Sequence, residues 1–159
     1  MRQITIVGMG PGSHTHLTME AYTCLTSGDC IYLRTSNHPV VRYLVEQGMR
    51  FKSFDGFYET AETFEETYQS IANAIIDQAQ REAVVYAVPG NPFVAEKTVK
   101  LIMDAAKELN IPVKVMHGVS FIDAIVTALA YDPVYGWDIR DALSIAIEDI
   151  QPRKDQLWI

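Results

Sequence analysis

The residues most suggestive of chemistry lie near the start of the chain, where an apolar run meets three glycines. Residues 4–7 read Ile-Thr-Ile-Val, which is typical of a buried strand, and Gly8, Gly10, Pro11 and Gly12 follow. Glycine permits backbone angles with positive φ and leaves the main chain open to close approach by a ligand. We therefore expect this junction either to bind a ligand or to form a tight structural turn.

Two further predicted strands also end in a loop that contains glycine or proline. Residues 83–88 run into Pro-Gly-Asn-Pro at 89–92, and residues 112–116 run into His-Gly-Val-Ser at 117–120. In a parallel sheet the carboxyl ends of the strands lie at one edge, where ligands usually bind. The three loops are therefore predicted to line one shared pocket.

The glycine spacing argues against one common kind of nucleotide site. The dinucleotide fingerprint has the form G-x-G-x-x-G, whereas Gly12 comes one residue early and Pro11 precedes it. A dinucleotide-binding oxidoreductase is therefore a weak hypothesis for this chain.

Other residue types that carry chemistry form no recognisable catalytic or metal site. The four histidines are His14, His16, His38 and His117. Their spacing specifies no metal site, and exposure in loops or a capping role is the favoured interpretation. Cys24 and Cys30 lack the C-x-x-C spacing and are expected to be two buried free thiols. No residue is predicted to be catalytic and no metal is expected.

Composition limits the classes of partner. The 159 residues are 48% hydrophobic and carry a formal net charge of -7, without the clustered Lys and Arg that a nucleic-acid surface requires. No apolar run approaches the roughly 20 residues of a membrane helix. The first residues lead into a strand rather than a signal peptide. We therefore expect a cytoplasmic protein with a small-molecule substrate and neither a nucleic-acid nor a membrane partner.

The elements that must position these loops alternate between strands and helices. The pattern predicts strands over 4–7, 30–33, 51–54, 83–88 and 112–116, and helices over 17–27, 40–47, 62–81, 94–109 and 121–130. A turn is expected at 55–56, followed by a loop. In the helix over 62–81, an apolar stripe that starts at Phe64 is expected to face the core. This alternation predicts an α/β fold with a mainly parallel sheet covered on both faces.

An ordered series of segments resembles the tetrapyrrole (corrin/porphyrin) methylase family, the class III S-adenosylmethionine-dependent methyltransferases. These segments are residues 7–13 with Leu17-Thr18, 32–41, 53–55, 88–99 and 118–121. Within the family they are similar to the branch in which a methylase-like domain precedes a MazG-type nucleotide pyrophosphohydrolase region. The series covers nearly the whole chain.

The resemblance implies two α/β domains with S-adenosylmethionine bound between them, a homodimer, and methyl transfer to a tetrapyrrole or another small molecule. The family's cofactor-binding loops fall on Gly8, Gly10, Pro11 and Gly12, on Gly90, Asn91 and Pro92, and on Gly118, Val119 and Ser120. Because a sulfonium already activates the methyl group, such a site mainly aligns the reactants and needs no catalytic triad.

One residue departs from the family pattern. The second loop of the family is usually Gly-Asp-Pro, and Asn91 stands here in place of the carboxylate. The neutral amide removes a negative charge that could favour a cationic sulfonium ligand. A noncatalytic ligand-binding or regulatory module attached to a nucleotide pyrophosphohydrolase is therefore the alternative function.

The end of the chain suggests an incomplete second domain. We expect a first domain over residues 1–116, and a linker helix with the start of the second domain over 117–159. Residues 156–159 read Gln-Leu-Trp-Ile and look like the beginning of a strand. The chain thus resembles an N-terminal fragment that would be inactive by itself, and a naturally short variant is the alternative.

Overall fold

The computed structural model describes residues 2–141 and 157–159. The chain divides into two compact units, Met1–Phe121 and Ile122–Ile159. The three loops singled out above begin in the first unit, which is therefore described first.

The first unit is built on a five-stranded parallel sheet, as predicted. Its strands are β1 (Ile4–Gly8), β2 (Ile31–Leu33), β3 (Lys52–Ser53), β4 (Val84–Val88) and β5 (Val113–Met116). Their order is β3-β2-β4-β1-β5, and every neighbouring pair runs parallel. The central strand β4 therefore pairs with both β1 and β2.

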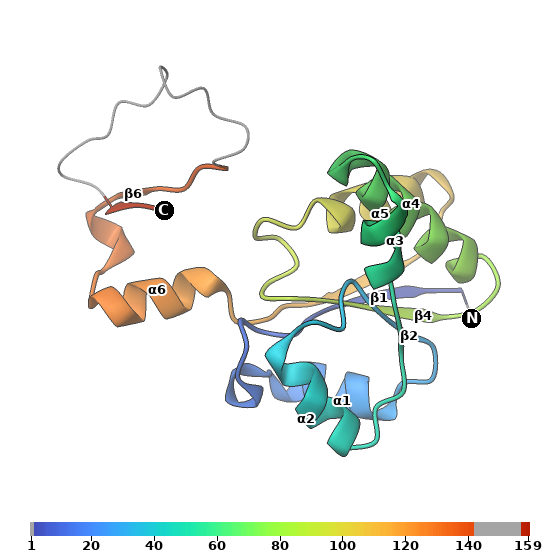
Figure 1. Cartoon of the computed structure of the whole chain (residues 1–159), viewed down its shortest axis with the longest axis horizontal. Helices are drawn as coiled ribbons and strands as arrows, with labels where there is room; N and C mark the ends of the chain where they lie inside the picture. Colours follow the sequence, from blue (N-terminus) through green and yellow to red (C-terminus); the bar gives the residue numbers. More distant parts are fainter. Residues whose placement is uncertain (1, 142–156) are drawn as a thin grey trace. The chain divides into compact units, whose positions relative to one another are not determined.

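Helices cover both faces of this sheet (Figure 1). They are α1 (Met19–Ser27), α2 (Pro39–Glu46), α3 (Asp55–Thr60), α4 (Phe64–Ala79) and α5 (Lys97–Glu108), with a short 3-10 helix at His14–His16. Helices α1 and α2 lie on one face, and α3, α4 and α5 lie on the other. This arrangement confirms the α/β fold class.

Two apolar cores result from the alternation of side chains along the strands. Ile4 and Ile6 of β1 pack in the core beneath α4 and α5, whereas Val7 packs in the core beneath α1 and α2. Successive strand residues point to opposite faces, so a strand that is apolar at nearly every position must be covered twice. Tyr86 of β4 is fully buried in the first core.

Local signals in the sequence set several helix boundaries. The Thr18 hydroxyl accepts a hydrogen bond from the Ala21 amide at 3.1 Å, which caps α1 as predicted. Pro39 occupies the first turn of α2, where its missing N–H removes no helical hydrogen bond. Thr63 caps α4 by accepting from the Glu66 amide at 3.2 Å.

Two local predictions were wrong. Residues 55–60 form helix α3 rather than a turn and a loop, because Phe57 packs against buried Phe54 with ring centroids 5.3 Å apart. Phe64 does not join the buried stripe, since it lies in the first turn of α4 with 58% of its surface exposed. It stacks instead on Tyr68 of the next turn, with ring centroids 6.2 Å apart.

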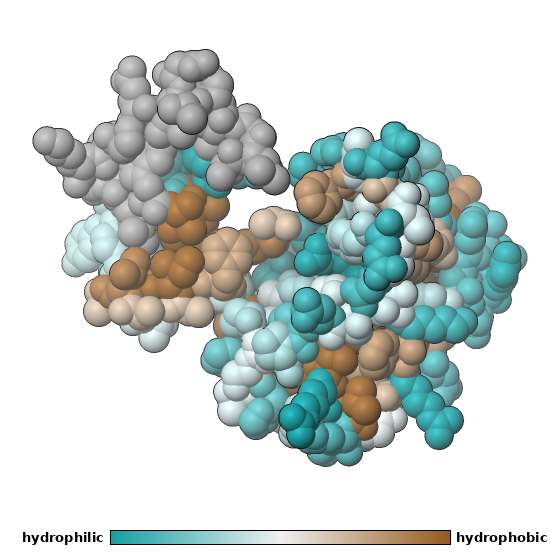
Figure 2. Space-filling view, in the orientation of Figure 1, coloured by the Kyte–Doolittle hydropathy of each residue, from teal (hydrophilic) through white to brown (hydrophobic). Residues whose placement is uncertain are grey.

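The second unit is small and carries an apolar helix. Helix α6 (Phe121–Leu129) is followed by a 3-10 helix at Pro133–Tyr135 and by β6 (Trp137–Asp138). Strand β7 (Leu157–Trp158) pairs parallel with β6, so the predicted strand at the chain end is present. Figure 2 shows that the visible surface of α6 is largely apolar. Among residues 2–141 and 157–159, no helix combines the length and apolar character needed to cross a bilayer.

Candidate functional site

The loops that follow β1 and β4 are joined through their glycines. The Gly10 amide donates to the Gly90 carbonyl at 3.2 Å, and the Gly90 amide donates back to the Gly10 carbonyl at 2.8 Å. This pair forms an isolated antiparallel bridge beyond the ends of two parallel strands. The structure thus brings together two of the three loops that the sequence predicted to meet.

The loop after β5 packs against the same point. A Cβ atom built on Gly8 would lie 2.6 Å from both the Gly118 nitrogen and the Gly90 carbonyl oxygen, and one built on Gly118 would overlap that same oxygen. Neither position can hold a side chain without moving backbone. Glycines 8, 10, 90 and 118 therefore form a continuous patch of main chain, which we call the glycine platform.

The four platform glycines differ in what they face. Gly8 and Gly118 serve the contact between loops, and a Cβ on Gly10 would lie 2.9 Å from the His16 carbonyl oxygen. Gly90 has a φ of +65°, and a Cβ there would have no heavy atom within 4 Å. Gly90 is therefore the position at which the platform is open to a ligand.

Asn91 connects the second loop to the third. Its Nδ2 donates to the Gly118 carbonyl at 3.0 Å, and its Oδ1 accepts from the Phe93 amide at 2.9 Å. The amide thus bridges across the loops and also closes a turn within its own loop. Asn91 itself is half-buried.

The other predicted cofactor residues surround the platform at different depths. Pro92 and Ser120 are buried, whereas Pro11, Gly12 and Val119 are half-buried. The Gly12 Cβ position has only the Pro39 ring within 4 Å, at 3.8 Å. The structure therefore places Gly8 at the end of β1 and the other nine predicted residues in the three loops around the same group of strand ends.

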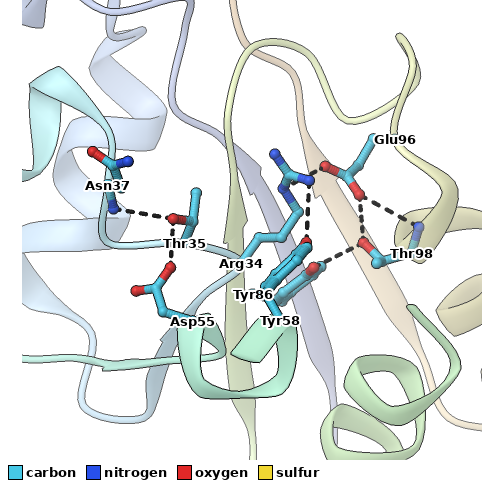
Figure 3. A network of polar contacts seen from close by, with 8 residues as sticks. All are labelled: Arg34, Thr35, Asn37, Asp55, Tyr58, Tyr86, Glu96 and Thr98. Carbon is cyan, nitrogen blue, oxygen red and sulfur yellow. Dashed lines mark hydrogen bonds and ion pairs between the residues drawn. The ribbon is translucent and has the colours of Figure 1, made fainter. Parts of the chain in front are cut away.

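A polar network lies beside the second loop (Figure 3). Arg34 follows β2, and its Nε lies 3.0 Å from Oε2 of Glu96, whose side chain is only 5% exposed. The other Glu96 oxygen accepts from the Thr98 hydroxyl at 2.6 Å. Thr98 in turn hydrogen-bonds the buried Tyr86 hydroxyl at 2.8 Å, and Arg34 donates to the Tyr58 hydroxyl at 3.3 Å.

This network connects the loop between β4 and α5 to the segment after β2, to α3, to β4 and to α5. Desolvation by burial is the largest single influence and opposes the Arg34 charge, but Glu96 together with the neighbouring tyrosines outweighs it, so the pKa of Arg34 is raised. Burial also raises the pKa of Tyr58 and raises that of Tyr86 well above its usual range. Both tyrosines are therefore neutral hydrogen-bonding groups rather than bases.

A second network fixes the loop after β2. The Asp55 carboxylate accepts from the Thr35 hydroxyl at 2.5 Å, and from the Ser36 hydroxyl and amide at 2.5 and 2.9 Å. Burial alone would raise the pKa of Asp55, but these hydrogen bonds lower it to about 2. The carboxylate is therefore ionised at neutral pH and holds Thr35 and Ser36 against the start of α3.

The histidines have separate structural surroundings. Burial lowers the pKa of His38, the Arg34 charge acts in the same direction, and a hydrogen bond with the Gly10 backbone opposes both. His14 stacks on Tyr43 with ring centroids 4.5 Å apart, and His117 is exposed. In the part of the chain that the structure describes, no group of three or more His, Cys, Asp or Glu could hold a metal ion.

Sequence reasoning missed the Arg34–Glu96 network. Both residues lie in segments that resemble the family, but no spacing rule joins two charges from different loops. The usable signal was position: Arg34 comes directly after one predicted strand, and Glu96 lies in the segment that follows another. Charges placed at such strand ends can meet at one edge of a parallel sheet. Tyr86 gave a weaker signal, because a hydroxyl inside a strand buried on both faces requires a polar partner.

Comparison with protein families gives one match that spans almost the whole chain. The model of the tetrapyrrole (corrin/porphyrin) methylases matches residues 3–158. The chain is also 40% identical over 151 residues to the Bacillus subtilis protein YabN, covering 95% of this chain and 31% of YabN. It therefore spans about a third of that relative's length.

Solved methyltransferase structures share the fold. A uroporphyrin-III C-methyltransferase from Thermus thermophilus superposes with a TM-score of 0.64 at 23% identity, covering 87% of this chain and 60% of that one. Another structure of a uroporphyrin-III C-methyltransferase from Thermus thermophilus was solved in complex with S-adenosylhomocysteine. It gives a TM-score of 0.56 at 19% identity, covering 79% of this chain and 47% of that one.

Proposed function

Because this chain belongs to the tetrapyrrole (corrin/porphyrin) methylase family, we propose that its glycine platform binds S-adenosylmethionine. The chain then acts within an S-adenosylmethionine-dependent methyltransferase whose acceptor is a tetrapyrrole or another small molecule. The main support is the convergence of three glycine loops at the ends of β1, β4 and β5, with Gly90 open to approach. A related fold binds S-adenosylhomocysteine, which has the same adenosyl group.

The residues around the platform fit such a ligand chemically. A position at φ +65° with nothing within 4 Å of its Cβ lets a ligand reach the main chain directly. Gly8, Gly10 and Gly118 are buried and Gly90 is half-buried, so a ligand would reach the main-chain polar atoms of the platform at Gly90. When bound, the sulfonium supplies an already activated methyl group, so the protein needs no nucleophile of its own.

In this proposal the surrounding networks orient the loops rather than react. The Arg34–Glu96 pair holds the loop between β4 and α5, and Asp55 holds the loop after β2. Fixed loops present fixed backbone dipoles, which favour binding because less ordering remains to be done. The neutral tyrosines beside Arg34 contribute hydrogen bonds and exclude water.

Calorimetry of the full-length protein tests the proposal. We expect S-adenosylmethionine and S-adenosylhomocysteine each to bind at one site per chain, and a nucleoside triphosphate not to compete with them. Binding of the triphosphate alone, with no heat from either adenosyl ligand, would refute the proposed site. Transfer of a labelled methyl group to a tetrapyrrole then tests the activity separately from the binding.

A noncatalytic ligand-binding module is the second candidate. The observation that favours it is Asn91, whose amide binds the protein rather than presenting a negative charge to a sulfonium. Such a module would bind S-adenosylhomocysteine at least as tightly as S-adenosylmethionine and transfer no methyl group. Comparing the two affinities and the transfer rate therefore distinguishes the candidates.

The wider assembly is also a proposal. We propose that the chain precedes a MazG-type nucleotide pyrophosphohydrolase region, that it forms a homodimer, and that it works in the cytoplasm. The resemblance of segments such as 32–41 and 88–99 supports the first assignment. Cys24 and Cys30 are free thiols, as expected in a reducing compartment, although both are half-buried rather than buried. The mass and oligomeric state of the native protein test the first two assignments directly.

A further inference from the structure

We infer that the side-chain amide of Asn91 is a tether that holds the third loop, residues 117–120, on the glycine platform and so preforms the surface for an adenosyl ligand. The tether is a property of the protein alone, whereas its effect on a ligand rests on the proposed function. Asn91 is therefore a positioning residue rather than a group that reacts.

The first support is that both ends of the amide are engaged. Nδ2 donates to the Gly118 carbonyl of the third loop, and Oδ1 accepts from Phe93 in its own loop. One side chain thus fixes a turn in the second loop and attaches the third loop to that turn. Rotation of the amide by 180° would place a donor against the Phe93 amide and an acceptor against the Gly118 carbonyl, so the orientation is unambiguous.

The second support is the tight packing at the point of attachment. Gly118 lies so close to Gly8 and to the Gly90 carbonyl that no side chain fits there. A hydrogen bond to the Gly118 carbonyl therefore acts at the position where a small displacement of the third loop would open the platform. The Gly10–Gly90 bridge fixes the other two loops in the same way through the backbone.

The third support is chemical. An ionised aspartate at position 91 could accept from Phe93 but has no hydrogen to donate to Gly118. Its negative oxygen would instead face the carbonyl oxygen and repel it. The neutral amide is therefore the form that this contact requires, and Asn91→Asp removes one half of the interaction while keeping the other.

Selective labelling of the full chain tests the tether without any ligand. The pairs Gly118-Val119 and Pro92-Phe93 each occur once in the 159 residues. Carbonyl-labelled glycine with 15N-valine thus reports the Gly118 carbonyl, and carbonyl-labelled proline with 15N-phenylalanine reports the Phe93 amide. Asn91→Asp should shift the Gly118 carbonyl signal upfield and leave Phe93 amide exchange slow. Asn91→Ala should shift the same signal and speed Phe93 exchange about tenfold.

Calorimetry on the full-length protein tests the effect on binding. We expect S-adenosylhomocysteine to bind about 3- to 10-fold more weakly to both variants, the range set by the loss of one hydrogen bond. Asn73→Asp is the matched control, since it makes the same charge change on the exposed side of α4. It should alter neither NMR signal, and its affinity should stay within about twofold of the wild type.

The outcomes separate the two parts of the inference. An unchanged Gly118 signal in both Asn91 variants would overturn the tether. A shifted signal with unchanged affinity would overturn the preforming role while leaving the tether in place. If the wild-type protein binds no adenosyl ligand, the proposed function fails and the preforming role fails with it, whereas the Gly118 signal still decides the tether.

Discussion

At the scale of single residues, the Arg34–Glu96 pair shows how charge is kept inside this protein. The Glu96 side chain is almost completely buried, while a quarter of Arg34 remains exposed. A buried pair need not stabilise a fold relative to apolar residues, but removing one partner leaves the other charge without compensation. The pair is therefore a sensitive point for mutation.

Glu96→Gln should destabilise the protein by about 2 kcal/mol, less than for a fully buried pair because water reaches part of Arg34. The amide oxygen can still accept from the Thr98 hydroxyl, so the loss reports the missing charge. Urea unfolding followed by circular dichroism measures it. Asp104→Asn breaks the exposed Lys100–Asp104 pair and should cost less than about 0.5 kcal/mol. Equal losses in the two variants would contradict this account.

Asp55 should make stability depend on pH at the acid end. Its pKa falls from 3.8 to about 2 on folding, so the folded state binds protons less readily than the unfolded state. The stabilisation is present above pH 3.8 and is lost as pH falls toward 2. Because the group is largely solvated, we expect about 1 kcal/mol. Asp55→Asn should lower stability at pH 6 and flatten its dependence on pH between about 4 and 2. A wild-type slope retained in the variant would contradict the assignment.

At the scale of elements, the platform glycines have different roles that substitution can separate. Gly118→Ala places a Cβ against the backbone of the first two loops, so we expect a loss of about 2 kcal/mol or more from forced backbone movement. Gly90→Ala meets no atom and costs only the strain of a positive φ, about 1 kcal/mol. Thermal unfolding compares the two variants.

The Gly90→Ala variant should also bind the proposed ligand less tightly. Folded Gly90→Ala protein should bind S-adenosylhomocysteine at least about tenfold more weakly, since the new methyl group occupies the open side of the platform. Gly48→Ala is the matched control, because Gly48 also has a positive φ, +94°, and no heavy atom within 4 Å of its Cβ position, but it follows α2 and lies outside the three loops. Full affinity in Gly90→Ala would place the ligand elsewhere.

How far the sequence could predict these features depends on the range of the interactions. Caps such as Thr18, and Pro39 in a first turn, act within a few residues, so helix starts could be predicted. Helix α3 was missed because its six residues are too few to show a helical repeat of apolar positions. Its formation also depends on packing against Phe54. The Asn91 tether and the Arg34–Glu96 pair join separate loops, and only the folded topology brings those loops together.

At the scale of the whole molecule, the second unit exposes large apolar side chains. Leu129 is 57% exposed and Val134 is 79% exposed. Apolar surface of this kind favours association. We expect the 159-residue chain to sediment as a dimer at high micromolar concentration, and a Leu129→Ser, Val134→Ser variant to sediment as a monomer. A wild-type monomer at every concentration would exclude this surface as a dimer contact.

The strand order also constrains how the protein is made. Strand β4 lies between β1 and β2. The two strands that are synthesised first therefore do not pair with each other in the native sheet. The centre of the sheet can form only after residues 84–88 have left the ribosome, and β5 joins later still. Until then the apolar segments of β1, β2 and α4 are exposed, a state in which nascent chains need chaperones. A released fragment of residues 1–83 should therefore be protease-sensitive, and one of residues 1–121 protease-resistant.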